Sequence, residues 1–136
     1  GVMQMRRINM LDSEKIELVE SYVSRYNAFD VAGLLDLLDD DVVFENESNG
    51  EITARSDGKA EFESLASDSA KIFSARQQVV TAMEMSDLAA TVNIDYTGTL
   101  ALDLPNGLKA GQVLELKGQT YFEFQNGKIS HIKDVS

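Results

Sequence analysis

The sequence has no cysteine and one histidine, and these two shortages exclude several kinds of chemistry. Without cysteine there is no disulfide, no thiolate nucleophile and no cysteine-ligated zinc site. His131 alone cannot build a metal centre of several imidazoles, and it leaves the serines without the partners of a hydrolase triad. We therefore expect no metal site.

Basic residues are also scarce: 12 lysines and arginines face 23 acidic residues, so the net charge is −11. A field of that sign repels phosphate backbones and anionic membrane surfaces, so we expect neither nucleic acid nor a membrane as partner. No apolar run reaches the ~20 residues that span a bilayer. The first ten residues do not have the pattern of a secretory signal, and the sequence has no cysteine, so we expect a cytoplasmic protein.

The length of 136 residues suits one domain with a real core, and the apolar fraction of 43% is ordinary. We expect a single domain over 1–136, in which residues 1–12 form an irregular N-terminal extension. Apolar residues recur at helical spacing over 16–26 and over 31–38, where Asp30 can cap the second helix. A third helix is expected over 59–73.

Three aspartates, residues 39–41, follow the second helical pattern, and we interpret them as a solvated acidic turn. A calcium loop counted from Asp39 would need a glutamate at its twelfth position, which is Gly50. A short strand is expected over 42–45, and a polar loop from there to Gly58.

The second half of the chain changes to a period of two. Alternating apolar and polar residues over 78–104, 112–125 and 128–135 predict β-strands, and Asn126-Gly127 is a strong hairpin-turn signal. Helices followed by an antiparallel meander predict an α+β domain with the helices on one face of a curved sheet.

Two stretches, SRYNAFDVAGLLDLLDDDVVFEN and YFEFQNGKISHIKDVS, resemble parts of NTF2-like proteins, in particular the SnoaL-like and ketosteroid isomerase-related branch. The resemblance extends from about Ser13 to Ser136. It implies a cone of three N-terminal helices packed on a strongly curved, mostly antiparallel sheet, with an apolar cavity open at one end. It also implies a site without cofactor and a homodimer formed through the outer face of the sheet.

The resemblance to ketosteroid isomerases places three residues in the cavity. Tyr22, eight residues before Asp30, takes the position of their active-site tyrosine. Asn46 stands where they have the general base, and Thr120 where they have a second oxyanion donor. Since an amide and a hydroxyl replace both carboxyls, the resemblance argues against steroid isomerisation by that mechanism.

Another carboxylate is available on the last strand, where Asp134 shares a face with Ile132 and Ser136. The resemblance turns this face toward the cavity. SnoaL-like cyclases work with a single cavity aspartate, so Asp134 and Tyr22 are the expected catalytic residues. Desolvation would raise the pKa of Asp134, as suits a general acid or base. The alternative is that Asp134 is solvated, or bonded to Tyr22 or Asn46 in a purely structural network.

Further residues are expected to contact the ligand: Asn46, Thr120, Tyr26, Phe44 and Phe122. For the aromatic members of this group, wall and core roles both stay open. His131 has the opposite strand parity, so we expect it on the surface or at the dimer interface.

Three functions remain open from the sequence. The first is cofactor-free acid/base chemistry, of cyclase or isomerase type, on a small hydrophobic carbonyl compound. The second is a non-catalytic module that binds a hydrophobic small molecule. The third is a dimeric scaffold whose cavity is filled by its own side chains.

Overall fold

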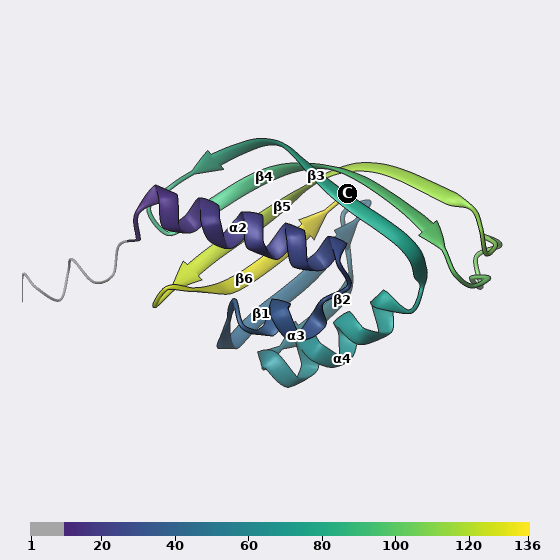
Figure 1. The fold of residues 1–136 in the computed structure, drawn as a ribbon, viewed down its shortest axis with the longest axis horizontal. Coiled ribbons are helices and arrows are strands. Elements are labelled where there is room, and N and C mark those ends of the chain that lie inside the picture. The colour runs from purple at the N-terminus through teal and green to yellow at the C-terminus, as the bar shows by residue number, and fades with distance from the viewer. Residues whose placement is uncertain (1–9) are drawn as a thin grey trace, which may run out of the picture.

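The computed structural model describes residues 10–136, which form a curved sheet with helices on its concave side (Figure 1). The helices are α2 (Asp12–Asn27), α3 (Val31–Leu35) and α4 (Gly58–Ala70). The strands are β1 (Leu38–Ser48), β2 (Glu51–Asp57), β3 (Phe73–Met85), β4 (Ala89–Leu100), β5 (Val113–Gln125) and β6 (Lys128–Val135). The predicted α+β class is confirmed. Within residues 10–136, no helix is long and apolar enough to cross a membrane.

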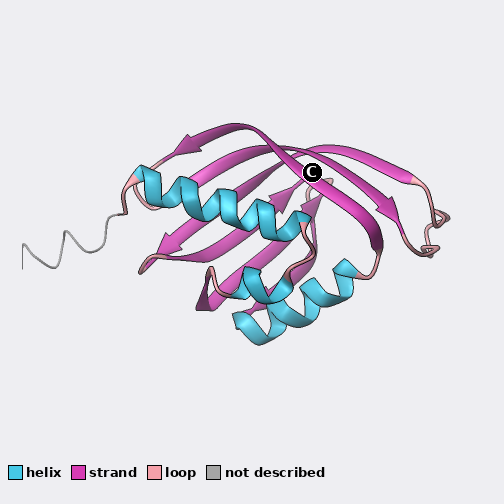
Figure 2. Ribbon diagram, viewed as in Figure 1, coloured by secondary structure: helices cyan, strands magenta, loops and turns pink. Residues whose placement is uncertain are grey.

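All six strands belong to one sheet, in the order β2-β1-β6-β5-β4-β3. Every neighbouring pair is antiparallel except β1 and β6, so the sheet is mostly antiparallel as expected. The parallel pair arises because the chain leaves β1 through β2 and α4, enters the far edge at β3, and returns strand by strand. Figure 2 shows the long strands β3, β4 and β5 arching over α2. The helices α3 and α4 lie on the other side of α2 from these strands, and α4 contacts β1 and β2.

The core lies between α2 and the inner face of the sheet. Val19 and Tyr22 of α2 are three residues apart, which places them on one face of the helix. The buried core residues are Val19, Tyr22, Leu34, Leu37, Leu38, Val42, Phe62, Ala90, Val92, Ile94, Phe122, Phe124, Ile129 and Ile132. Each large side chain buried in this way stabilises the fold by ~1.5–3 kcal/mol.

The β5–β6 hairpin turns at Asn126-Gly127, as predicted. Both residues have positive φ angles, 53° and 77°, which a two-residue type I′ turn requires. The paired strands that follow place Thr120 of β5 opposite Asp134 of β6.

Lys15 is a buried cation on α2 with 1% of its surface exposed. Its Nζ donates hydrogen bonds to the carbonyl oxygens of Ser86 (2.6 Å) and Asp87 (3.2 Å), and lies 3.0 Å from the Asp12 carboxylate. The lysine therefore ties the first turn of α2 to the β3–β4 turn.

We expect Lys15→Met to lower the free energy of unfolding by about 2 kcal/mol, because two turn carbonyls lose their donor. Lys59→Met is the matched control, since it removes only a 3.7 Å ion pair with the exposed Asp40. The control should change stability by less than about 0.5 kcal/mol. Urea denaturation measures both, and equal effects of the two substitutions would contradict the role of Lys15.

Several predicted boundaries were wrong. β1 begins at Leu38, so residues 39–41 lie in a strand and not in a turn. The pairing of β1 with β6 is irregular between Leu38 and Val43, and Asp40 and Asp41 are exposed there. Residues 1–9 of the expected N-terminal extension lie outside the described residues, and α2 already begins at Asp12.

The segment expected as a polar loop contains β2, an edge strand. Ser56 is the one residue of β2 that is fully buried, so the strand lacks the alternation that signals a half-buried strand. The third helix ends at Ala70, earlier than predicted, and Phe73 opens β3.

The outer face of the sheet carries a polar network. His131 lies 2.9 Å from Glu45 and 3.5 Å from Glu123, and Lys133 lies 3.3 Å from Glu47. His131 therefore faces away from the helices, as its strand parity predicted. The homodimer expected through this face stays a prediction.

Candidate active site

A cavity of about 360 Å³ lies between α2, α4 and the inner face of the sheet. Its walls include six of the seven residues expected from the sequence: Tyr22, Tyr26, Phe44, Asn46, Thr120 and Asp134. Most of the remaining lining is apolar, with Leu65, Phe73 and Ile94 among its members. The cavity thus combines an apolar interior with a few polar side chains, as small-molecule sites do.

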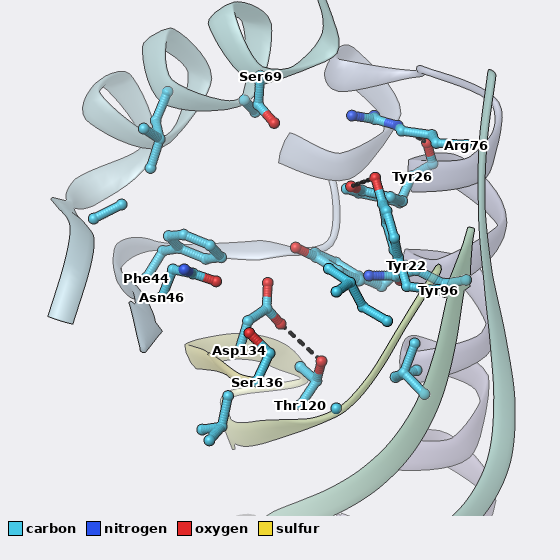
Figure 3. A pocket seen from close by; sticks show the side chains of 18 of the residues that line it. Tyr22, Tyr26, Phe44, Asn46, Ser69, Arg76, Tyr96, Thr120, Asp134 and Ser136 are labelled. Carbon is cyan, nitrogen blue, oxygen red and sulfur yellow. Dashed lines mark hydrogen bonds between the residues drawn. The ribbon is translucent and has the colours of Figure 1, made fainter. Parts of the chain in front are cut away.

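The polar side chains at one end of the cavity form a row across three strands. Thr120 of β5 is opposite Asp134 of β6, and Asp134 is in turn opposite Asn46 of β1. Because side chains in register on neighbouring strands point to the same face, all three reach the inner side of the sheet. Figure 3 shows them together with Tyr22, which approaches from α2.

Asp134 is held by a short hydrogen bond. The Thr120 hydroxyl donates to Asp134 Oδ1 at 2.7 Å, which leaves the other carboxylate oxygen facing the cavity. Burial raises the pKa of Asp134 to about 6, and the bond from Thr120 acts in the opposite direction by stabilising the charged form. At neutral pH the carboxylate is mostly ionised, with a proton affinity suited to a general base.

Tyr22 presents its hydroxyl to the Asp134 carboxylate, with no hydrogen bond joining them (Figure 3). The ring packs edge-on against Phe122, at 5.4 Å between centroids, and this contact fixes its orientation. Burial, and then the negative charge of Asp134, raise the pKa of Tyr22 well above its ordinary value. The hydroxyl therefore stays protonated and can serve as a hydrogen-bond donor at neutral pH.

The Asn46 side chain is oriented by two neighbouring hydroxyl groups. Its amide nitrogen donates to the hydroxyls of Thr53 (2.7 Å) and Ser48 (3.3 Å). Figure 3 shows the carbonyl oxygen of Asn46 directed toward Asp134 instead. In this arrangement Asn46 offers the cavity an acceptor, so Tyr22 is the donor beside Asp134.

Of the three aromatic residues expected either in the cavity wall or in the core, two line the cavity and one lies in the core. Tyr26 and Phe44 line the cavity, and the Tyr26 hydroxyl shares a 3.1 Å hydrogen bond with that of Tyr96. Phe122 is 1% exposed and is not among the residues that line the cavity; its ring packs against those of Tyr22 and Phe124. Phe122 therefore belongs to the core in this structure, and the expected contact between Phe122 and a ligand is not supported by the lining of the cavity.

The amino-acid sequence also matches a known protein family that agrees with the fold described above. The family model described as the SnoaL-like domain matches residues 19–132. The chain belongs to the SnoaL-like family. The family resemblance stated from the two sequence stretches is confirmed.

The solved structures that are similar to this SnoaL-like domain are named after different reactions. A candidate polyketide cyclase from Xanthomonas campestris pv. campestris has 22% identity and a TM-score of 0.75, covering 91% of this chain and 90% of that one. A candidate SnoaL-like polyketide cyclase from Jannaschia sp. CCS1 has 13% identity and a TM-score of 0.76, covering 90% and 84%. An LEH-like epoxide hydrolase from M. tuberculosis has 18% identity and a TM-score of 0.72, covering 90% and 82%.

These similarities confirm the NTF2-like, ketosteroid isomerase-like fold. At such low sequence identities the similarities do not assign a reaction to this chain, because proteins with this fold have many unrelated functions. No curated protein matches the chain.

The SnoaL-like cavity also contains polar residues that the sequence reasoning missed, Arg76 and Gln78 of β3 and Ser69 of α4. The available signal was the alternation of Arg76, Gln78 and Val80 on one face of a strand. A register shift between Val80 and Ala82 reverses this alternation further along β3, which hid the inward face.

No group of three or more His, Asp or Glu side chains within residues 10–136 is arranged to hold a metal ion. Asp134 is the one carboxylate side chain among the lining residues.

We expect Thr120→Val to move the pKa of Asp134 above its value of about 6, because the bond that favours the charged form is lost. Valine keeps the shape of threonine, so the cavity should be unchanged. If Asp134 acts as a base, activity rises with pH through this pKa, and the variant's profile should shift to higher pH. The ¹³C chemical shift of the Asp134 carboxyl, followed against pH, measures the change. An unshifted titration would show that Thr120 does not tune Asp134.

Proposed function

We propose that this SnoaL-like domain catalyses cofactor-free proton transfer at a carbon next to the carbonyl group of a small, mainly apolar compound. The observation that supports this is a single carboxylate, Asp134, with one oxygen free in an apolar cavity and the Tyr22 hydroxyl beside it. The names of the distant relatives described as polyketide cyclases agree with chemistry of this class.

In the proposed step, Asp134 removes a proton from the carbon adjacent to the carbonyl. The electron pair of the broken C–H bond forms a carbon–carbon double bond, and the carbonyl electrons move onto oxygen to give an enolate. The neutral Tyr22 hydroxyl donates a hydrogen bond to that oxygen as negative charge develops. Asp134 then returns its proton to carbon, or the enolate carbon attacks a second carbonyl of the same molecule and closes a ring, while the oxygen of that carbonyl receives the electron pair and takes up the proton from Asp134.

A second function, binding without catalysis, is favoured by one specific feature. Ketosteroid isomerases carry carboxyl groups at two positions that hold Asn46 and Thr120 in this chain. The cavity therefore lacks both of those carboxyl groups, and Asp134 is the one side-chain carboxylate that lines it. A binding module would hold an apolar ligand and leave it chemically unchanged.

The test is proton exchange on a probe ketone, 1-tetralone, in D₂O. If the proposal is right, the protein accelerates replacement of the protons next to the carbonyl by deuterium, seen as loss of their ¹H NMR signal. Binding of the ketone with no exchange above the buffer rate would support the binding module. Absence of both binding and exchange would remove both proposals.

A further inference from the structure

Arg76 lies at the end of the cavity opposite Asp134, where the reaction proposed above gives it no role (Figure 3). Its side chain is deeply buried, with 7% of the residue exposed. Nε donates a 3.0 Å hydrogen bond to the carbonyl oxygen of Tyr26, near the C-terminal end of α2. This bond uses one of the five N–H donors of the guanidinium.

The guanidinium plane is held by two aromatic rings. Its central carbon lies 3.7 Å from the ring centroid of Tyr26 and 4.3 Å from that of Phe29. Phe29 has a φ of 59°, a left-handed conformation that is rare for a bulky residue. Phe29 follows the C-cap of α2, where the N–H groups of Phe29 and Asp30 donate to the carbonyl oxygens of Tyr26 and Arg25 as in a Schellman motif, and this helix ending also places the Phe29 ring over Arg76. Stacking of this kind leaves the donors at the edge of the guanidinium free.

Arg76 has no counter-ion from its own chain. It forms no ion pair with any residue in 10–136, and the nine residues before these contain no aspartate or glutamate. A buried charge without a partner is unfavourable, because desolvation is not offset by an opposite charge. An anionic group on a ligand would supply the missing partner.

Other hydrogen-bond donors surround the same end of the cavity. Gln78 is two residues along β3 and shares the inward face, and Ser69 reaches in from α4. The hydroxyls of Tyr26 and Tyr96 form one hydrogen bond with each other, in which one of the two hydroxyls is the donor. The hydrogen of the other hydroxyl is then available to a further acceptor. This end is therefore rich in donors, while the opposite end holds the Asp134 carboxylate.

We propose that Arg76 binds the carboxylate of the substrate, which makes the substrate class an apolar keto acid. The carboxylate lies against Arg76 and the carbon that loses its proton lies against Asp134. A carboxylate fits better than a phosphate, because the cavity has one cation and a planar guanidinium pairs with a planar carboxylate through two parallel bonds. The keto part of this assignment rests on the function proposed above, whereas the carboxylate part rests on Arg76 alone.

The test compares two probes of the same size, 2-naphthoate and the neutral ketone 2-acetylnaphthalene, by isothermal titration calorimetry. We expect the wild-type protein to bind the carboxylate about tenfold or more tightly than the ketone. Arg76→Met should remove this preference while affinity for the ketone changes less than about threefold, and Arg76→Lys should retain part of it. Asp134→Asn should keep or increase the preference, because it removes a negative charge from the other end of the cavity.

Two results would overturn the proposal. One is a wild-type protein that binds the ketone as well as the carboxylate. The other is a preference that survives Arg76→Met. Should Arg76→Met fail to fold, a crystal structure of the wild type with 2-naphthoate decides: a carboxylate on the guanidinium supports the proposal, and a carboxylate elsewhere ends it.

The same experiment separates the carboxylate site from the proton-transfer proposal. Binding preference is read without any reaction, so it can be present in a protein that never exchanges protons on 1-tetralone. Exchange without a charge preference would retain the enzyme and discard the Arg76 site. Charge preference without exchange would leave a carrier for apolar carboxylic acids.

Discussion

Replacing Asp134 with asparagine should slow proton exchange on 1-tetralone by about 10²–10⁴-fold and leave the affinity for the ketone within about threefold. The amide keeps the size of the carboxylate and can still accept the 2.7 Å hydrogen bond from Thr120. It cannot take up a proton at neutral pH, so the loss should appear in the rate and not in binding. Exchange rates from ¹H NMR, together with calorimetric affinities, measure both.

The control for this substitution is Asp95→Asn, which makes the same chemical change outside the cavity. Asp95 lies 3.2 Å from Lys117 in an exposed ion pair. We expect its replacement to leave the exchange rate unchanged. If Asp134→Asn exchanged protons as fast as the wild type, Asp134 would not be the base.

The same variant should be more stable than the wild type at neutral pH. The folded-state pKa of Asp134, about 6, lies above its ordinary value of 3.8, so ionisation is harder in the folded protein than in the unfolded chain. The wild type therefore loses stability as pH rises between these values, by ~3 kcal/mol in full above pH 6, and asparagine avoids this loss. Urea denaturation should show the stability gain at pH 7.5 and none below about pH 4. A merely structural Asp134 would give the opposite sign, since its replacement would destabilise the fold.

The residues at the Asp134 end of the site could be predicted from the sequence because two local rules decide where they point. Strand alternation turns Asp134 and Thr120 to the same face as their apolar neighbours, although a register shift between Glu123 and Phe124 moves the pairing that begins at the Asn126-Gly127 turn by one residue. Helical spacing places Tyr22 on the core side of α2. Each of these rules operates within a few residues, and the family resemblance supplied the link between the segments.

The remainder of the site depends on contacts between segments distant in the sequence. The inward direction of Arg76 is concealed by the register shift in β3 and by its stacking against the end of α2. The amide of Asn46 is turned by Thr53, which belongs to an edge strand without clear alternation. Neither contact leaves a periodic signal, so the sequence indicated that Asn46 is present without showing which of its atoms faces the cavity.

The arrangement of charge in the cavity follows from these contacts. Asp134 and Arg76 are opposite charges that do not form an ion pair, and they lie at opposite ends of one cavity (Figure 3). A direct pair would neutralise both and leave neither for a ligand. Their separation instead gives the cavity a donor-rich, cationic end at Arg76 and an anionic end at Asp134. This difference would fix the direction in which an asymmetric ligand enters.

Replacing Tyr22 with phenylalanine should lower the exchange rate by about 10²–10³-fold, the usual effect of removing one oxyanion donor. The ring would remain packed on Phe122, and the hydroxyl makes no hydrogen bond to Asp134 in the unliganded protein. We therefore expect little change in stability or in ketone affinity, since the hydroxyl acts mainly on the charge that develops in the transition state.

The control for Tyr22→Phe is Tyr121→Phe on the outer face, where the hydroxyl donates to Glu123 at 2.7 Å and is remote from the cavity. Its exchange rate should match that of the wild type. The pH profile adds a second criterion, because Tyr22→Phe should keep the inflection near pH 6 that belongs to Asp134 while the whole curve falls. A full rate in Tyr22→Phe would mean that the enolate oxygen is stabilised elsewhere, and with Asn46 Nδ2 bonded to Thr53 and Ser48 the donors at the Arg76 end would be the next to replace.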